Sequence, residues 1–257
     1  MLRVEQTGPV LTITLDRPAR RNSQTPSLWS ALAEIGEGLD ASVRVVVIRA
    51  EGPSFSAGLD RDMLTPHGVP GEPSVLALAA DAAAGGPGEL EDAIAQFQRG
   101  FAIWADVPAI TIAAVQGHAI GAGFQLALAC DLRVVADDVA FAMRETSLGL
   151  VPDLAGTSPL VRSIGYARAL EICVTGRYVG AQEAVAIGLA SVAVSGGDLD
   201  AAALDLADAI LQAPQAAVRE LKALLRNAID GSPTDQLKAE REAQARLLTA
   251  IVAGPGK

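Results

Sequence analysis

The sequence contains few of the residues that build metal centres and disulfide frameworks. Among its 257 residues are two cysteines, Cys130 and Cys173, and two histidines, His67 and His118. The cysteines are not spaced as a CxxC pair, and no cluster of Cys and His has the spacing of a zinc site. We therefore expect two unpaired thiols in a reducing cytoplasm, and we expect no metal.

Positive charge is also scarce. The chain has 20 Lys and Arg residues against 30 Asp and Glu residues, so its formal net charge is −10. This balance argues against binding of nucleic acid, which requires a basic face. No apolar run is long enough to cross a membrane, and the segment MLRVEQTGPV lacks the apolar core of a signal peptide. These observations predict a cytoplasmic protein that binds neither nucleic acid nor membrane.

The hydrophobic pattern predicts an α/β fold. Near-continuous apolar runs at Val43–Ile48 and Ile110–Val115 are typical of parallel strands covered on both faces, and Val10–Leu15 alternates as a half-buried strand does. Apolar residues recur with helical spacing in Pro26–Leu39 and Leu90–Trp104. Further strands are expected at Leu132–Ala136 and Leu189–Val194, and further helices at Pro159–Val174, Gly180–Gly188, Asp198–Gln212, Pro214–Ile229 and Thr234–Val252.

Two long segments differ from this rhythm of strands and helices. From Arg61 to about Gly88 the period is lost among Pro, Gly and Ala, which predicts an irregular lid or pocket wall. After Gly196 only helical patterns remain. We therefore expect a core in residues 1–195 and a helical C-terminal region in residues 196–257.

The most informative stretch runs from Ala114 to Val134. A strand ends in a glycine-rich turn, Gly121 to Gly123, which opens an apolar helix. This order aims free backbone N–H groups and the positive end of a helix dipole at one point, which suits an anion or a developing oxyanion. The phosphate-loop and GxGxxG patterns are both absent. A second loop, Glu51 to Asp60, carries the small residues that let a ligand approach the backbone closely.

Arg17, Arg20 and Arg21 form the densest basic cluster of the chain. Such a cluster is commonly a solvated turn, and it is equally suited to clamping phosphates. The sequence leaves both interpretations open.

Three blocks in register carry a family resemblance. Phe55 to Asp60 (FSAGLD), Ala113 to Val134 (AAVQGHAIGAGFQLALACDLRV) and Glu145 to Thr157 (ETSLGLVPDLAGT) resemble the signature blocks of the crotonase (enoyl-CoA hydratase/isomerase) superfamily. The segments LDRPARRN and TGRYVGAQEAVAIGLASVAV match that family too. The resemblance implies a core of stacked ββα units with an acyl-CoA site in residues 1–195. It also implies that residues 196–257 assemble the chain as a homotrimer or a dimer of trimers.

The resemblance also implies a set of site residues. The backbone N–H groups of Leu59 and Ala122 would form an oxyanion hole for the thioester carbonyl, with coenzyme A entering as part of the substrate and no separate cofactor. The adenine would lie near Ala57 and the phosphates near the arginine cluster. The implied substrate-binding positions are Arg17, Arg20, Arg21, Ala57, Gly58, Asp60, Gly121 and Gln125.

The carboxylates bear on the reaction type. Hydratases of this family hold a water with two glutamates, and these positions fall on Gln125 and Glu145. A glutamine cannot serve as general base. Asp153 resembles the aspartate that some family isomerases use. The alternatives are that Glu145 caps a helix or pairs with Arg144, and that Asp153 caps the helix that starts near Ser158.

These features favour double-bond isomerisation over hydration, with Glu145 or Asp153 moving the proton. Burial among Leu148, Leu150, Val151 and Leu154 is expected to raise the pKa of either carboxyl group. Two alternatives remain: hydration with a single glutamate, and a catalytically weak acyl-CoA-binding protein. A serine protease of the Clp type lacks a plausible base, because His118 is expected to pack beneath the glycine turn and His67 to be solvated in the lid.

Overall fold

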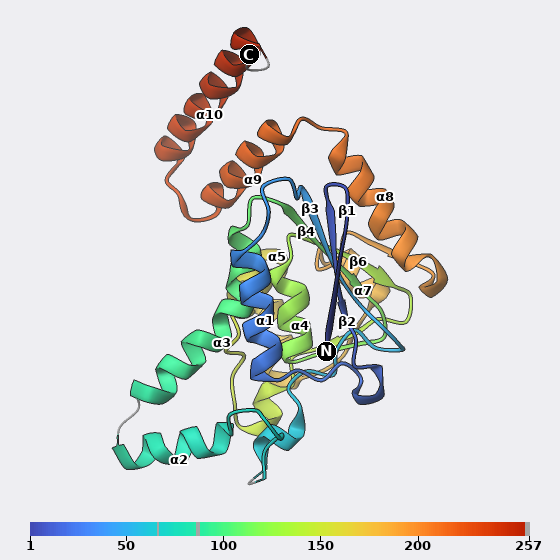
Figure 1. Ribbon diagram of the computed structural model, residues 1–257, viewed down its shortest axis with the longest axis vertical. Coiled ribbons are helices and arrows are strands. Elements are labelled where there is room, and N and C mark those ends of the chain that lie inside the picture. The colour runs from blue at the N-terminus through green and yellow to red at the C-terminus, as the bar shows by residue number, and fades with distance from the viewer. Residues whose placement is uncertain (66, 86–87, 255–257) are drawn as a thin grey trace. The chain divides into compact units, whose positions relative to one another are not determined.

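The computed structural model describes residues 1–65, 67–85 and 88–254 (Figure 1). The chain divides into two compact units, Met1–Ala207 and Asp208–Lys257. No helix of the described residues is long and apolar enough to cross a membrane. Nor do His, Cys, Asp and Glu side chains gather as a possible metal site within the described ranges.

A six-stranded sheet forms the centre of the first unit. Its strand order is β1-β2-β3-β4-β6-β9, in which β1 and β2 are antiparallel and all other neighbours are parallel. The strands are β1 (Leu2–Thr7), β2 (Val10–Leu15), β3 (Val45–Ala50), β4 (Ile110–Val115), β6 (Leu132–Ala136) and β9 (Val192–Val194). The expected strands are confirmed, although β9 is shorter than its apolar run. The edge strand β1 was not predicted, because its apolar residues are limited to Leu2 and Val4 and most of its side chains are exposed.

A smaller sheet has the order β5-β7-β8. It consists of β5 (His118–Ile120), β7 (Ala140–Ala142) and β8 (Val179–Gly180). None of these was predicted from the sequence, because two or three residues are too few to display a period of two.

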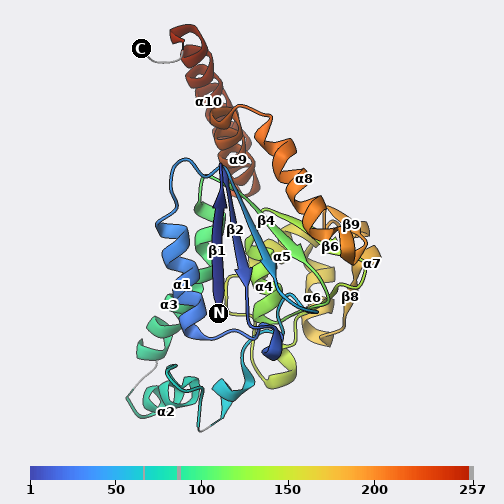
Figure 2. The same ribbon diagram turned by 45° about the vertical axis from the view of Figure 1, so that its right-hand side comes forward.

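Helices make up most of the other elements. In chain order they are α1 (Pro26–Glu37), α2 (Val75–Gly85), α3 (Gly88–Asp106), α4 (Ala122–Ala129), α5 (Thr157–Ile164), α6 (Tyr166–Thr175), α7 (Ala181–Ala186) and α8 (Leu199–Leu211), with short 3₁₀ turns η1 (Pro18–Arg20), η2 (Arg61–Leu64), η3 (Glu145–Leu148) and η4 (Gly196–Asp198). Figures 1 and 2 show α1 and α3 side by side. Their closest approach is at Gly100, where a Cβ would lie 2.4 Å from the carbonyl oxygen of Trp29.

Two expectations about helices were wrong. The segment expected to be irregular contains α2, whose alanines have high intrinsic helix propensity but give little amphipathic contrast. Pro66, Gly86 and Pro87 of that segment lie outside the described residues. The helix expected at Pro159–Val174 is two helices, α5 and α6, because Gly165 between them has φ 79°.

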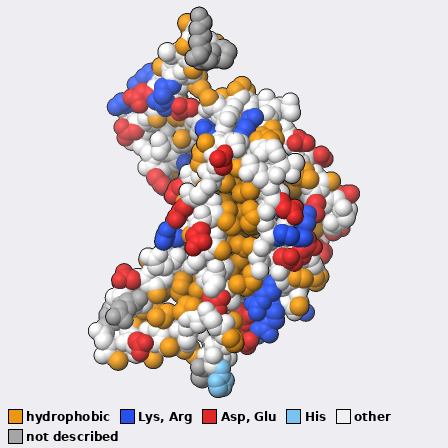
Figure 3. Space-filling view, viewed as in Figure 1, with side chains coloured by type: hydrophobic (Ala, Val, Ile, Leu, Met, Phe, Trp, Pro, Cys, Tyr) orange, Lys and Arg blue, Asp and Glu red, His pale blue; other side chains and the backbone are white. Residues whose placement is uncertain are grey.

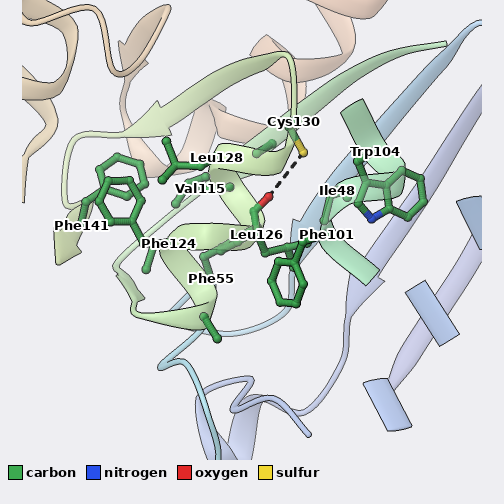
Figure 4. Packing of buried hydrophobic residues seen from close by; sticks show 14 of the residues in the cluster. Ile48, Phe55, Phe101, Trp104, Val115, Phe124, Leu126, Leu128, Cys130 and Phe141 are labelled. Atoms are coloured by element: carbon green, nitrogen blue, oxygen red, sulfur yellow. Dashed lines mark hydrogen bonds between the residues drawn. The ribbon is translucent and has the colours of Figure 1, made fainter. Parts of the chain in front are cut away.

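The hydrophobic core centres on α4. Every residue from Ala122 to Leu128 is buried, so this helix has no solvent-facing side. Figure 4 shows Phe124 against Phe141, with ring centroids 4.8 Å apart, and Cys130 donating its Sγ–H to the carbonyl oxygen of Leu126. The core therefore holds α4, and the turn at its start, in one position.

The second unit consists largely of α9 (Gln215–Asp230) and α10 (Pro233–Ala253), as the helical patterns predicted. Ser232 caps α10 by accepting from the N–H of Asp235. Arg246 and Glu220 form a two-pronged ion pair between the two helices, with both N···O distances 2.8 Å.

Candidate active site

Two loops meet at the carboxyl ends of the neighbouring parallel strands β3 and β4. The loop after β3 is joined to β5 by backbone hydrogen bonds: Ser56 N–H donates to His118 O, and Ile120 N–H donates to Ser56 O, each over 2.9 Å. Ligands of α/β proteins bind at this edge of the sheet. The hydrogen bonds fix the second loop, which leads into α4, against the first.

Glycines bring Leu59 and Ala122 close together. Gly58 has φ 84° and Gly121 has φ 51°. A Cβ on Gly58 would lie 2.5 Å from the carbonyl oxygen of Ile120 and 3.4 Å from the N atom of Ala122. Ala122 is the first residue of α4, so its N–H has no acceptor within the helix. In the part of the chain that the structure describes, neither Leu59 N–H nor Ala122 N–H donates a hydrogen bond.

The Glu145 carboxyl group lies beside this turn, its Oε1 3.0 Å from where a Cβ on Gly121 would stand. Gln125 donates its Nε2–H to that oxygen over 2.8 Å, while the buried Oε2 accepts no hydrogen bond from the described residues. Burial raises the pKa of Glu145; the hydrogen bond from Gln125 opposes this rise, and the charge of Asp153 adds to it. The alternative that Glu145 pairs with Arg144 is wrong for the described residues, because that guanidinium donates to the carbonyl oxygen of Gly176. Glu145 does not cap η3 either, since the N-cap of η3 is Arg144.

Asp153 lies in the irregular segment between η3 and α5. Burial raises the pKa of its carboxyl group, as expected. The alternative that Asp153 caps α5 is wrong, because Gly156 is the N-cap and no side chain caps this helix. The residues expected to bury the carboxylates are also exposed, apart from Leu154: Leu148 is 58%, Leu150 47% and Val151 70% exposed. This apolar segment has no period from which its buried face could be read.

The arginine cluster is partly neutralised. Arg17 Nη1 donates to Asp60 Oδ2 over 2.8 Å, and Arg20 Nη2 donates to Asp60 Oδ1 over 2.9 Å and to Asp62 over 2.6 Å. Burial alone would raise the pKa of Asp60, but hydrogen bonds from the Asp62 N–H and both arginines hold it below its usual value. Arg21 has no side-chain partner within the described residues. It therefore carries the least compensated charge of the cluster.

A cavity of about 460 Å³ adjoins the first loop. Of the residues implied by the family resemblance, its wall contains Arg20, Arg21, Ala57, Leu59 and Asp60. The remaining implied residues are not part of this wall: Arg17, Gly58, Gly121, Ala122, Gln125, Glu145 and Asp153. Figure 3 shows Lys and Arg side chains gathered in a patch on the lower right of that face of the molecule.

The wall also contains polar residues that were not predicted as site residues: Ser23, Arg61, His118, Arg144, Ser147 and Tyr178. His118 does not pack beneath the glycine turn. It is exposed, and its ring lies edge-on to that of Tyr178 with centroids 6.2 Å apart. In β5, Ala119 is buried and its neighbour His118 is exposed, as successive side chains of a strand point to opposite faces. A strand of three residues is too short for this alternation to be recognised in the sequence.

Comparisons with known proteins identify the family of this chain. Residues 5–253 match the family model described as enoyl-CoA hydratase/isomerase. A putative enoyl-CoA hydratase from Thermobifida fusca in complex with acetoacetyl-CoA is 46% identical, with a TM-score of 0.91 over 97% of this chain and 95% of that one. The same protein in complex with CoA aligns with a TM-score of 0.91 at 44% identity, over 98% and 95% of the two chains.

Relatives with assigned names are more distant. The chain is 32% identical to a probable enoyl-CoA hydratase of Mycobacterium tuberculosis, over 98% of this chain and 88% of the relative. It is also 32% identical to carnitinyl-CoA dehydratase of Salmonella arizonae, over 98% and 90%. Together with the family match over nearly the whole chain, these similarities show that the protein belongs to the enoyl-CoA hydratase/isomerase family of the crotonase superfamily, whose enzymes act on CoA thioesters.

Proposed function

We propose that this protein moves the double bond of an enoyl-CoA thioester through an enolate intermediate. The observation that carries this proposal is the close approach of Gly58 to the start of α4, where the N–H groups of Leu59 and Ala122 have no acceptor among the described residues. The Glu145 carboxyl group lies beside the same turn, and its Oε2 has no partner among those residues. The N–H groups would receive the thioester oxygen as negative charge develops on it. By analogy with other oxyanion holes, each donor contributes roughly 10²–10³ to the rate.

Asp153 is the proposed proton shuttle. Isomerisation requires a carboxylate that removes a proton from one carbon and returns it to another, and burial gives Asp153 a pKa above its usual value. Glu145 is the alternative shuttle. Neither role requires a bound water.

The hydrogen bonds of Gln125 support isomerisation over hydration. Its Oε1 accepts from the N–H groups of Leu154 and Gly156, over 2.8 and 3.3 Å, and its Nε2 donates to Glu145. Both lone pairs of the amide oxygen are therefore engaged, so Gln125 has no acceptor left for a water. It cannot take the proton that a second glutamate would take.

The cavity wall is suited to the coenzyme part of the substrate. Arg20, Arg21, Arg61 and Arg144 line it, and among the described residues Asp60 is the sole carboxylate on the wall. In a protein of net charge −10, this local excess of guanidinium groups is where a polyphosphate would be attracted. The neighbouring structures that hold CoA and acetoacetyl-CoA support the same assignment.

Hydration is the second candidate, and Glu145 favours it. Its buried Oε2 without a partner is an acceptor on which a water could be activated by one carboxylate alone.

Two substrates separate these candidates. A 3-enoyl-CoA should be converted to its conjugated isomer, whereas crotonyl-CoA should be hydrated slowly or not at all.

Asp153→Asn should abolish isomerisation, and Glu145→Gln should do so if Glu145 is the shuttle instead. Full activity of both variants would refute the proton-shuttle mechanism. Binding of the thioesters without any product would identify an acyl-CoA-binding protein.

We also propose that the helices of residues 196–257 assemble the chain as a trimer or a dimer of trimers. Leu221, Leu225 and Ile229 share one face of α9 at a spacing of four, and they are 54%, 61% and 49% exposed. Light scattering on the purified protein should give a multiple of three chains. Leu225→Glu should lower that mass, and a wild-type protein of single-chain mass would exclude the proposal.

A further inference from the structure

One peptide unit in the segment before α5 is held from both sides by glutamine side chains. Its carbonyl oxygen, that of Asp153, accepts from Gln98 Nε2 over 2.7 Å. Its N–H, that of Leu154, donates to Gln125 Oε1 over 2.8 Å. The two glutamines come from different helices, since Gln98 belongs to α3 and Gln125 to α4. The peptide is therefore fixed against two separate elements of the core.

The conformation of this segment requires such support. Ala155 has φ 61°, a left-handed conformation that is strained for a residue with a Cβ. That conformation lets the N–H groups on either side of it, from Leu154 and Gly156, reach the same oxygen of Gln125. The two hydrogen bonds to Gln125 Oε1 therefore stabilise the left-handed conformation of Ala155.

We infer that Gln98 and Gln125 are positioning residues for the carboxyl group of Asp153. Each fixes one end of the peptide unit that directly follows the Asp153 Cα, and this limits where the side chain can point. The inference rests on the proposed function, in which Asp153 moves the proton. Gln125 also binds Glu145, so Gln98 is the residue that isolates the effect on Asp153.

A glutamine that only stabilises the segment before α5 and a glutamine that positions the Asp153 carboxylate would affect kcat differently. Neither Gln98 nor Gln125 belongs to the wall of the cavity that would hold the coenzyme. A displaced Asp153 would therefore slow the chemical step while leaving thioester binding intact. Loss of loop structure alone would lower stability without selectively lowering kcat.

The test compares variants of Gln98 in the full-length protein with a 3-enoyl-CoA as substrate. Gln98→Met keeps the size of the side chain but removes its donor, and it should lower kcat about tenfold, the rate equivalent of one hydrogen bond, with KM unchanged. Gln98→Lys restores a donor and should recover most of that loss. Gln98→Glu places an acceptor against the Asp153 carbonyl and should be slower than Gln98→Met. The matched control is Gln182→Met on the exposed side of α7, which should behave as wild type.

Three results would overturn the inference: wild-type kcat in Gln98→Met, an increase in KM alone, or equal losses in Gln98→Met and Gln98→Lys. Asp153→Asn is measured in parallel. It distinguishes a failure of the positioning role of Gln98 from a failure of the proposed role of Asp153. If Asp153→Asn isomerises as fast as wild type, the proposed role of Asp153 fails. If Asp153→Asn is inactive while Gln98→Met is unaffected, only the positioning role fails.

Discussion

Gln125 donates its amide Nε2–H to Glu145 Oε1 over 2.8 Å, and the second oxygen of that carboxyl group remains buried without a partner among the described residues. One neutral hydrogen bond is thus set against the desolvation of a carboxylate. The effect of burial on the pKa of Glu145 is larger than that of the hydrogen bond, so the pKa is raised. The site therefore holds a group that lowers the stability of the fold whenever it is ionised.

This balance predicts how Glu145→Gln affects stability. A carboxyl group with a raised pKa binds its proton more tightly in the folded state, so its stabilising contribution is present at low pH and is lost as the pH rises through the folded-state pKa. The variant removes that dependence. Relative to wild type, its thermal midpoint should therefore rise as the pH increases from the ordinary Glu pKa of 4.5 through the raised pKa of the folded state. A difference that stays constant across this range would contradict the pKa shift.

Asp60 predicts the opposite dependence. Its pKa is lowered, so its contribution is present at neutral pH and is lost as the pH falls through the folded-state value. Asp60→Asn should reduce the free energy of unfolding at pH 7 by about 1–3 kcal/mol, since Arg17 and Arg20 lose a charged acceptor. In urea titrations the gap should shrink below about pH 3.9. Asp62→Asn, at an exposed position, should change stability much less.

Gly58→Ala should damage both stability and turnover. At φ 84° the new Cβ would stand 2.5 Å from the carbonyl oxygen of Ile120, so the loop that presents the Leu59 N–H must shift. The loss of one oxyanion donor corresponds to roughly 10²–10³ in kcat. Gly71→Ala is the matched control, because Gly71 has φ 83° with nothing within 4 Å, so it carries the backbone strain without the collision. Equal activity losses in the two variants would exclude a role for the loop geometry.

Gln125→Glu should increase hydration of crotonyl-CoA. A second carboxylate would restore the pair with which hydratases of this family hold water, and general base catalysis contributes about 10²–10⁴. The same change places two carboxylates in contact with each other and removes the donor to Glu145 Oε1, so isomerisation should fall. Loss of the conjugated thioester absorbance follows hydration directly. An unchanged hydration rate would show that this position does not choose between the two reactions.

Arg21→Ala should weaken CoA binding more than Arg20→Ala. Both residues line the cavity, but Arg20 shares its charge with Asp60 and Asp62. A hydrogen bond to a charged group contributes about 1.5–3 kcal/mol, so we expect a loss of about tenfold or more for Arg21→Ala in calorimetric titrations with CoA. The effect should diminish at high salt. Arg49→Ala, outside the cavity wall and paired with Glu51 and Asp200, is the control.

The sequence alone was sufficient for the central architecture. The apolar runs of β3 and β4 need cover on both faces, and the glycines at 58 and 121 mark the loops that follow them. Both properties are local, so they can be read from the residues themselves. The exposed edge strand β1 and the alanine-rich α2 left no such local pattern.

The network of the site was not predictable in the same way. Asp60 and Arg17 are separated by 43 positions, and nothing local indicates that the carboxylate takes up the charge of the cluster. Likewise, Gln98 and Asp153 are 55 positions apart. The sequence identified residue types suited to the chemistry, and the tertiary fold determined which of them are engaged with one another.

The donors proposed for the thioester oxygen are main-chain groups of residues 59 and 122. Every amino acid except proline supplies the same N–H, so exchanging either side chain leaves the donor in place. The side chains at these positions are thereby released to vary with the shape of the acyl group. A lineage can change its substrate range there while its charge-stabilising machinery is inherited intact.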